Sequence, residues 1–273
     1  MPDAPGTRRA LFGSLFLLSG AAGLVYELIW VRELYQFFGS TIHSVTTVVA
    51  AYMGGLGLGA YVMGRRADRH ANPARLYGIL ELAIGVFGIA SPLVFRGVGG
   101  AYLELARAVA PGLWAATAIK FVFAFAVLLV PTFLMGGTLP ILTRAFAGTR
   151  TDHLRRELAL FYGLNTLGGV AGCMLAGYVL VEYVGLRTSL FGTGVVNLAL
   201  GAAALALAGS GATAMSEPHA EPSAAGFETS AATRRLALWL IGITAFASLL
   251  YEIAWTRVLV LVVGGLWGGR LAA

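Results

Sequence analysis

The chain has 273 residues, of which 58% are hydrophobic and 12% are charged, and its formal net charge is +6. Soluble domains carry about 25% charged residues, so this composition excludes an ordinary water-soluble enzyme. It predicts an all-α polytopic membrane protein with the lipid bilayer as its solvent, because a helix satisfies its own backbone hydrogen bonds in lipid. Nucleic acid is not an expected partner, since the basic residues form short clusters between apolar stretches, a pattern typical of membrane topology.

Seven apolar stretches approach the length of about 20 residues that a membrane-spanning helix needs. They cover residues 11–30 (with an extension to residue 38 left open), 44–63, 76–95, 113–134, 158–181, 188–207 and 236–263. A segment rich in Ala, Ser, Glu and Pro separates the last two stretches and is typical of a flexible linker. We therefore predict a six-helix transmembrane domain over residues 1–208, a cytoplasmic linker over 209–235, a seventh transmembrane helix over 236–265 and a short tail over 266–273.

The distribution of arginine predicts the orientation. If the N-terminus is cytoplasmic, the cytoplasmic segments carry twelve arginines and the segments on the opposite side carry four. The positive-inside rule therefore favours an N-terminus in the cytoplasm. A cleaved signal peptide is the alternative for the first stretch, because Arg8 and Arg9 precede a suitable apolar run.

A sequence repeat links the first and last predicted helices. Residues 23–34 read GLVYELIWVREL and residues 248–259 read SLLYEIAWTRVL, at a constant offset of 225 residues. The shared Tyr-Glu-x-x-Trp-x-Arg pattern favours duplication over chance similarity. Six apolar stretches begin within the offset, so both copies cross the membrane in the same direction. This arrangement predicts a six-helix half bundle followed by the first helix of a second, parallel half.

Charged residues within the predicted spans are candidates for substrate binding. Glu27 and Lys120 both lie in the outer half of the bilayer at about 1.5 Å per residue, and Glu252 is the repeat counterpart of Glu27. Such residues either line a polar cavity that recognises a cation or form a structural pair, and Lys120 could instead reach the interface. We expect Glu81 near the inner interface and Trp30 in an interfacial aromatic belt.

Small residues at a spacing of four predict close helix packing. Ala51, Gly55 and Gly59 share one face of the second helix, and Gly168 and Gly172 share one face of the fifth. Near the end of the fourth helix, Pro131 and Pro140 bracket residues 135–138. This segment is either a broken helix that exposes carbonyl groups or a cytoplasmic turn, which we favour.

No catalytic, cofactor or metal site follows from the pattern. The four histidines are scattered over different loops and both sides, and Cys173 is the single cysteine. They cannot supply a clustered metal site or a Cys-x-x-Cys pair, so we expect no metal and no cofactor.

The segment after the second helix, Gly64-Arg65-Arg66-Ala67-Asp68-Arg69, resembles the front half of the loop motif of the major facilitator superfamily. In that family the residues that match Gly64, Asp68 and Arg69 belong to a structural loop that clamps helix ends on the cytoplasmic side. The second half of the motif is missing, because His70-Ala71-Asn72-Pro73 stands in its place.

Together with the repeat, the stretch from Ser19 to Arg69 resembles the opening of fused major facilitator/spermidine-synthase-like proteins of bacterial inner membranes. The resemblance covers most of residues 10–262 and implies a major-facilitator-like half bundle. Members of this family commonly continue into a cytoplasmic aminopropyltransferase domain. Five further helices and that domain have no counterpart here, so we expect a truncated, frame-shifted or split gene product and no aminopropyl transfer by this chain alone.

Three functions are compatible with these features. The first is a transporter-like membrane domain that handles a polyamine or another organic cation, with self-association or a partner chain supplying the missing half. The second is membership of the polyamine aminopropyltransferase family without the catalytic domain. The third is a membrane anchor or assembly module that transports nothing.

Overall fold

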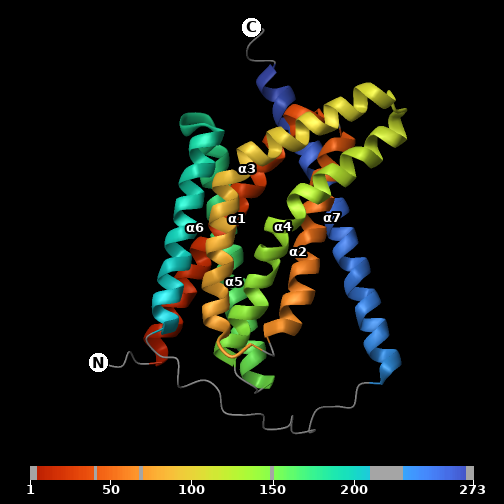
Figure 1. Ribbon diagram of the computed structural model, residues 1–273. Coiled ribbons are helices and arrows are strands. Elements are labelled where there is room, and N and C mark those ends of the chain that lie inside the picture. Colours follow the sequence, from red (N-terminus) through yellow and green to blue (C-terminus); the bar gives the residue numbers. More distant parts are fainter. Residues whose placement is uncertain (1–4, 40–41, 68–69, 148–150, 210–229, 269–273) are drawn as a thin grey trace. The chain divides into compact units, whose positions relative to one another are not determined.

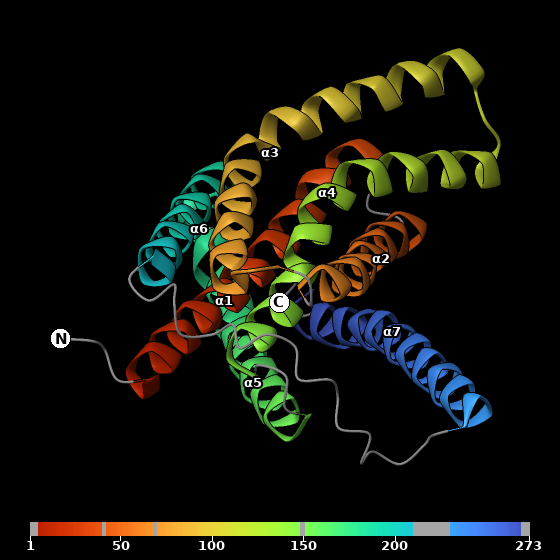
Figure 2. The same ribbon diagram turned by 60° about the horizontal axis from the view of Figure 1, so that its bottom comes forward.

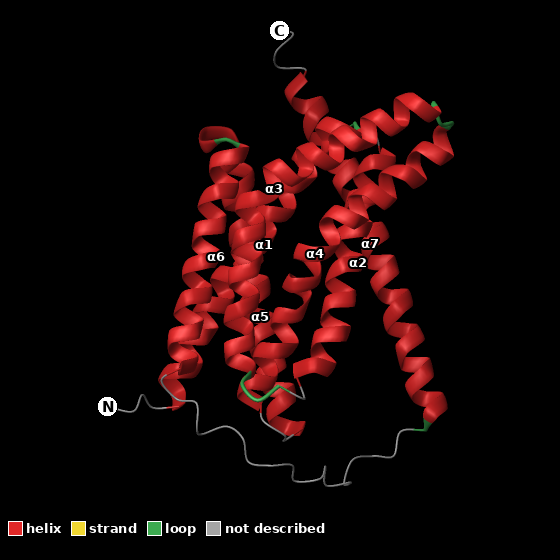
Figure 3. Cartoon of the chain, viewed as in Figure 1, coloured by secondary structure: helices red, strands yellow, loops and turns green. Residues whose placement is uncertain are grey.

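The computed structural model describes residues 5–39, 42–67, 70–147, 151–209 and 230–268, and every regular element within them is a helix (Figure 3). The elements are α1 (Pro5–Phe38), α2 (Ile42–Ala67), α3 (Pro73–Val109), α4 (Leu113–Ala147), α5 (Thr151–Leu175), the π-helix η1 (Ala176–Val184), α6 (Leu186–Gly209) and α7 (Ala231–Gly268). The all-α prediction is confirmed. Six helices in the described residues are long and apolar enough to cross a membrane.

The chain divides into two compact units, residues 1–220 and residues 221–273. The first contains α1 to α6 with η1, and the second contains α7. The predicted seventh span lies in α7, and its role as a span stays a prediction. The domain boundaries after residues 208, 235 and 265 also stay predictions.

Three helix pairs make the most extensive contacts in the first unit: α2 with α4, α3 with α6, and α1 with α5. Figure 1 and Figure 2 both show α3 beside α6 and α2 beside α4. Pairing of this kind buries one face of each helix while its other face carries exposed apolar side chains. Such outward apolar residues are expected where lipid is the solvent.

Small residues sit where these helix pairs approach each other. A Cβ atom at Gly59 of α2 would meet the Phe133 carbonyl group of α4, and one at Gly55 would meet the Thr132 side chain. Ala51, one turn before Gly55, is fully buried. Backbone contact this close requires residues without large side chains.

The α1–α5 pair also has small residues where the two helices approach each other. A Cβ atom at Gly168 would meet the Leu17 carbonyl group, and one at Gly172 would meet the Ala21 carbonyl group. The predicted small-residue faces of α2 and α5 therefore lie against backbone of a neighbouring helix. How much stability each glycine contributes stays a prediction.

The predicted turn near residues 135–138 is wrong, because α4 continues through Pro131 and Pro140 to Ala147. The glycines between the prolines serve the helix contact instead of a turn: Gly136 lies against the Leu56 backbone and Gly137 against the Met63 side chain. The Thr132 hydroxyl also donates to the Leu128 carbonyl at 2.6 Å within the same helix. The surrounding helices thus hold a segment whose local sequence favours a break.

α3 is also longer than predicted. It begins after Asn72, whose side-chain oxygen accepts from the Arg75 amide at 3.0 Å, and it passes residue 95 to end at Val109. Its C-cap, Ala110, has a positive φ of 44°, and Leu113 opens α4 after this short connection. α3 and α4 thereby run as a long hairpin whose connected ends bend away from α6 in Figure 2.

The prediction that Trp30 faces outward as an anchor in an interfacial aromatic belt is wrong. Its side chain is fully buried, stacks on Tyr26 with ring centroids 4.8 Å apart, and meets the rings of Phe87 and Phe95 edge-on. Its indole nitrogen donates to the Ser91 hydroxyl at 3.1 Å. An aromatic residue with a polar group can enter a core when that group finds a partner, which a hydropathy reading does not reveal.

Candidate functional site

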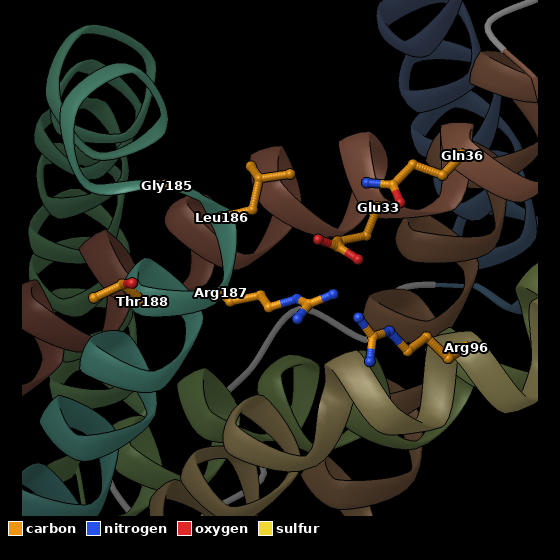
Figure 4. A pocket seen from close by; sticks show the side chains of 7 residues that line it. All are labelled: Glu33, Gln36, Arg96, Gly185, Leu186, Arg187 and Thr188. Atoms are coloured by element: carbon orange, nitrogen blue, oxygen red, sulfur yellow. The ribbon is translucent and has the colours of Figure 1, made fainter.

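A polar cavity of about 400 Å³ opens between the second half of α1, the middle of α3 and the start of α6. Glu33, Gln36, Arg96, Gly185, Leu186, Arg187 and Thr188 line it. Figure 4 shows the Glu33 carboxylate and the guanidinium groups of Arg96 and Arg187 directed toward the same space. Three charged side chains from three helices therefore converge on one cavity.

Glu33 is the buried member of this group. Its exposed fraction is 7%, whereas Arg96 and Arg187 are exposed. Arg187 acts on the Glu33 carboxylate electrostatically. An acidic side chain that is removed from water needs compensating charge or donors, and the nearby Arg187 guanidinium group supplies part of that charge.

The connection from η1 to α6 positions Arg187. The chain winds as a π-helix over Ala176–Val184 and turns at Gly185, whose φ of 87° is a conformation that favours glycine. The Leu180 carbonyl accepts from the Gly185 amide at 2.8 Å and from the Ser189 hydroxyl at 3.2 Å. These bonds fix the first turn of α6, and π-helical segments of this kind are frequent at functional sites.

A second polar cluster lies inside the bundle around Glu81 of α3. Its side chain is fully buried, one carboxylate oxygen accepts from the Ser19 hydroxyl at 2.6 Å, and the other accepts from the Asn197 amide at 2.6 Å. Neutral donors from α1 and α6 therefore hold an acidic group that belongs to α3. Glu81 is thus buried in a contact of three helices, and its depth near the inner interface stays a prediction.

Glu27 and Lys120, two of the predicted site residues, do not line the Figure 4 cavity. Glu27 is buried in α1 and interacts electrostatically with Tyr52 of α2. The Lys120 ammonium donates to the Phe38 carbonyl at the end of α1 at 2.7 Å. The side chain of Glu252 lies outside the described residues. A shared binding role for these three residues stays a prediction.

The predicted loop motif is described only in part. Gly64 lies in the last turns of α2, whereas Asp68 and Arg69 lie outside the described residues. Arg65, which is described, places its guanidinium group 4.3 Å from the centre of the Tyr61 ring. Such a contact is a cation–π interaction on the helix surface.

Sequence reasoning missed Glu33, Arg96 and Arg187 as a group. They are far apart in the chain, and each reads singly as a residue near a helix end. The signal that could have found them is their shared depth along the bundle. α1 and α3 run in the same direction, and α6 starts at the depth where Glu33 and Arg96 lie. Among the described residues, no cluster of three His, Cys, Asp or Glu side chains could hold a metal ion.

Comparisons with known proteins point to one enzyme class. The chain is 27% identical over 207 residues to polyamine aminopropyltransferase 2 of Streptomyces coelicolor, an alignment that covers 74% of this chain and 35% of that protein. It is 28% identical over 184 residues to a polyamine aminopropyltransferase of Corynebacterium efficiens, covering 66% of this chain and 32% of that protein. No family model and no solved structure matches the chain. The chain thus has a weak similarity to polyamine aminopropyltransferases and spans about a third of their length.

Proposed function

We propose that this chain is a bilayer-spanning helical module related to the polyamine aminopropyltransferases, and that it handles a polyamine or another organic cation. The observation that carries the cation role is Glu81, a fully buried carboxylate whose two hydrogen-bond donors are neutral side chains. An acidic residue inside a membrane bundle is by default a functional candidate, because its burial is costly. The polyamine is suggested by the names of the two relatives.

The bilayer setting rests on the six long apolar helices and on their outward apolar side chains. We propose that the N-terminus lies in the cytoplasm of a bacterial cell, because the segments on its side of the membrane carry most of the arginines. We further propose that α1 to α6 form a half bundle of the major-facilitator kind and that α7 begins a second half. The repeated motif supports this arrangement, and a second copy or a partner chain would complete it.

Cation binding can be tested on the full chain purified in detergent, by equilibrium dialysis against labelled spermidine. We expect saturable binding that Glu81→Gln weakens by about tenfold, which corresponds to about 1.4 kcal/mol. Glutamine preserves the shape of the side chain and can still accept from Asn197 while donating to Ser19, so the fold should persist. Glu27→Gln tests the predicted site in the same way.

The matched control is Glu104→Gln, because Glu104 also lies on α3 but is exposed and paired with Arg107. This variant removes the same charge without touching the bundle interior. Absence of saturable binding, or equal affinity in the Glu81→Gln variant and the wild type, would contradict the cation role. Uptake of labelled spermidine into liposomes containing the full chain then separates transport from binding alone.

The second candidate function is a membrane anchor that transports nothing. The close backbone contacts in the α1–α5 and α2–α4 pairs favour it, because such packing suits a rigid scaffold. It predicts a folded protein without spermidine binding. Catalysis by this chain alone is not part of either proposal, and formation of spermidine from putrescine by the purified chain would contradict both.

A further inference from the structure

The Figure 4 cavity has an excess of positive charge that the cation hypothesis does not use. Arg96 and Arg187 contribute two guanidinium groups, and Glu33 contributes one carboxylate. Two guanidinium groups facing the same space repel each other. One carboxylate compensates only part of that charge, so the space attracts a further negative group.

The start of α6 adds further donors beside Arg187. The Ser189 amide makes an early helical bond of α6, to the Gly185 carbonyl at 3.1 Å. The amides that precede it, at Leu186, Arg187 and Thr188, belong to the first turn, whose N–H groups lack partners within the helix. Helix N-termini also carry a partial positive charge that favours an anion.

Glu33 is the acidic side chain among the residues that line the cavity. The residue as a whole is 7% exposed, and its carboxylate points into the cavity, where it accepts no hydrogen bond from a described residue. Because Glu33 accepts no hydrogen bond from either guanidinium group, the donors of both groups remain available to a ligand.

We propose that this cavity binds a small ligand through a carboxylate or phosphate group held between Arg96 and Arg187. Guanidinium groups bind such planar or tetrahedral oxyanions through paired hydrogen bonds. The first-turn amides of α6 supply additional donors, and Glu33 competes with the ligand for the positive charge. A volume of about 400 Å³ lies within the range of small-molecule sites. The site is separate from Glu81 and does not depend on cation handling.

The test uses the full chain in neutral detergent with inorganic phosphate as the probe. Thermal unfolding is followed at constant ionic strength while phosphate replaces chloride. We expect a saturable rise in Tm, and we expect Arg96→Gln and Arg187→Gln each to weaken the apparent affinity by at least about tenfold. Both arginines are exposed, so these substitutions should leave the fold intact, which helical content by circular dichroism verifies.

Arg107→Gln is the matched control, since Arg107 lies on α3 outside the cavity and is paired with Glu104 at 2.7 Å. It should retain the wild-type response. Glu33→Gln should bind phosphate at least as tightly as the control, because it removes the competing negative charge. The proposal is overturned if wild type shows no saturable response, if Arg107→Gln loses it equally, or if Glu33→Gln binds more weakly than the control.

The oxyanion could be a free solute or the phosphate of a membrane lipid, and a second arm separates the two. The full chain is placed in nanodiscs of phosphatidylcholine alone or with phosphatidylglycerol. Both lipids carry a phosphodiester, so if a lipid phosphate occupies the cavity, free phosphate adds no stability in either nanodisc although it does so in detergent. If the ligand is a free solute, free phosphate raises Tm in both nanodiscs in wild type but not in Arg187→Gln.

Discussion

The indole nitrogen of Trp30 in α1 donates a hydrogen bond to the hydroxyl of Ser91 in α3 at 3.1 Å. That hydroxyl in turn donates to the Gly88 carbonyl at 2.8 Å. The first copy of the repeated motif therefore contributes a side chain that joins two helices inside the bundle. Its tryptophan is part of the core and takes no part in the candidate cavity.

We predict that Trp30→Ala lowers stability by about 3–5 kcal/mol, the usual cost of truncating a buried aromatic side chain. Trp30→Phe should cost less, because it loses the hydrogen bond to Ser91 but keeps most of the packing. Trp114→Ala is the control, since Trp114 is 79% exposed at the start of α4. Thermal unfolding in detergent measures all three, and equal Tm values for Trp30→Ala and Trp114→Ala would contradict the core role.

Periodicity and composition predict helices well here, because an apolar run of sufficient length has few alternatives in lipid. The same reasoning failed at Pro131 and Pro140, where contacts of Gly136 and Gly137 with α2 override a local preference for a turn. Tertiary packing of this kind cannot be recognised in the sequence of a single helix. Its physical cause is the fit between two backbones, and that fit depends on residues far away in the chain.

The candidate cavity was less predictable than the fold. Glu27 and Lys120 were predicted as binding residues because they are charged residues within apolar stretches, yet neither lines the cavity. Glu33 and Arg187 are separated by five helical elements and come together only when α1 and α6 pack. The charge pattern of one chain segment cannot predict that these side chains converge, because their convergence depends on the direction and depth of each helix in the bundle.

Gly59 and Gly57 of α2 offer a test of the α2–α4 contact. A Cβ atom at Gly59 would meet the Phe133 backbone, whereas one at Gly57 would have nothing within 4 Å. We expect Gly59→Ala to lower Tm, because two helices must move apart. Gly57→Ala should raise stability by about 0.5–1 kcal/mol, since alanine is the better helix former. Thermal unfolding compares them, and a Tm gain in both variants would count against close α2–α4 packing.

Lys120 is expected to act as a cap for the end of α1. Its ammonium donates to the Phe38 carbonyl at 2.7 Å, and Gly39, with a φ of 78°, ends the helix there. A cation near a helix C-terminus stabilises it by about 0.3–1 kcal/mol. Lys120→Met should therefore speed hydrogen exchange of amides near the end of α1 and leave the start of α1 unchanged. Unaltered exchange near Phe38 would show that the cap contributes nothing.

The proposed topology can be tested with single cysteines on opposite ends of α3. His70 lies in the connection before α3 and Trp114 at the start of α4, and both are exposed. In a Cys173→Ala background, His70→Cys and Trp114→Cys are treated in intact cells with a maleimide that does not cross membranes. An N-terminus in the cytoplasm requires labelling at residue 114 alone, with residue 70 labelled only after the cells are opened. Labelling of residue 70 alone would reverse the orientation, and immediate labelling of both would mean that α3 does not cross the bilayer, because its two ends would then face the same compartment.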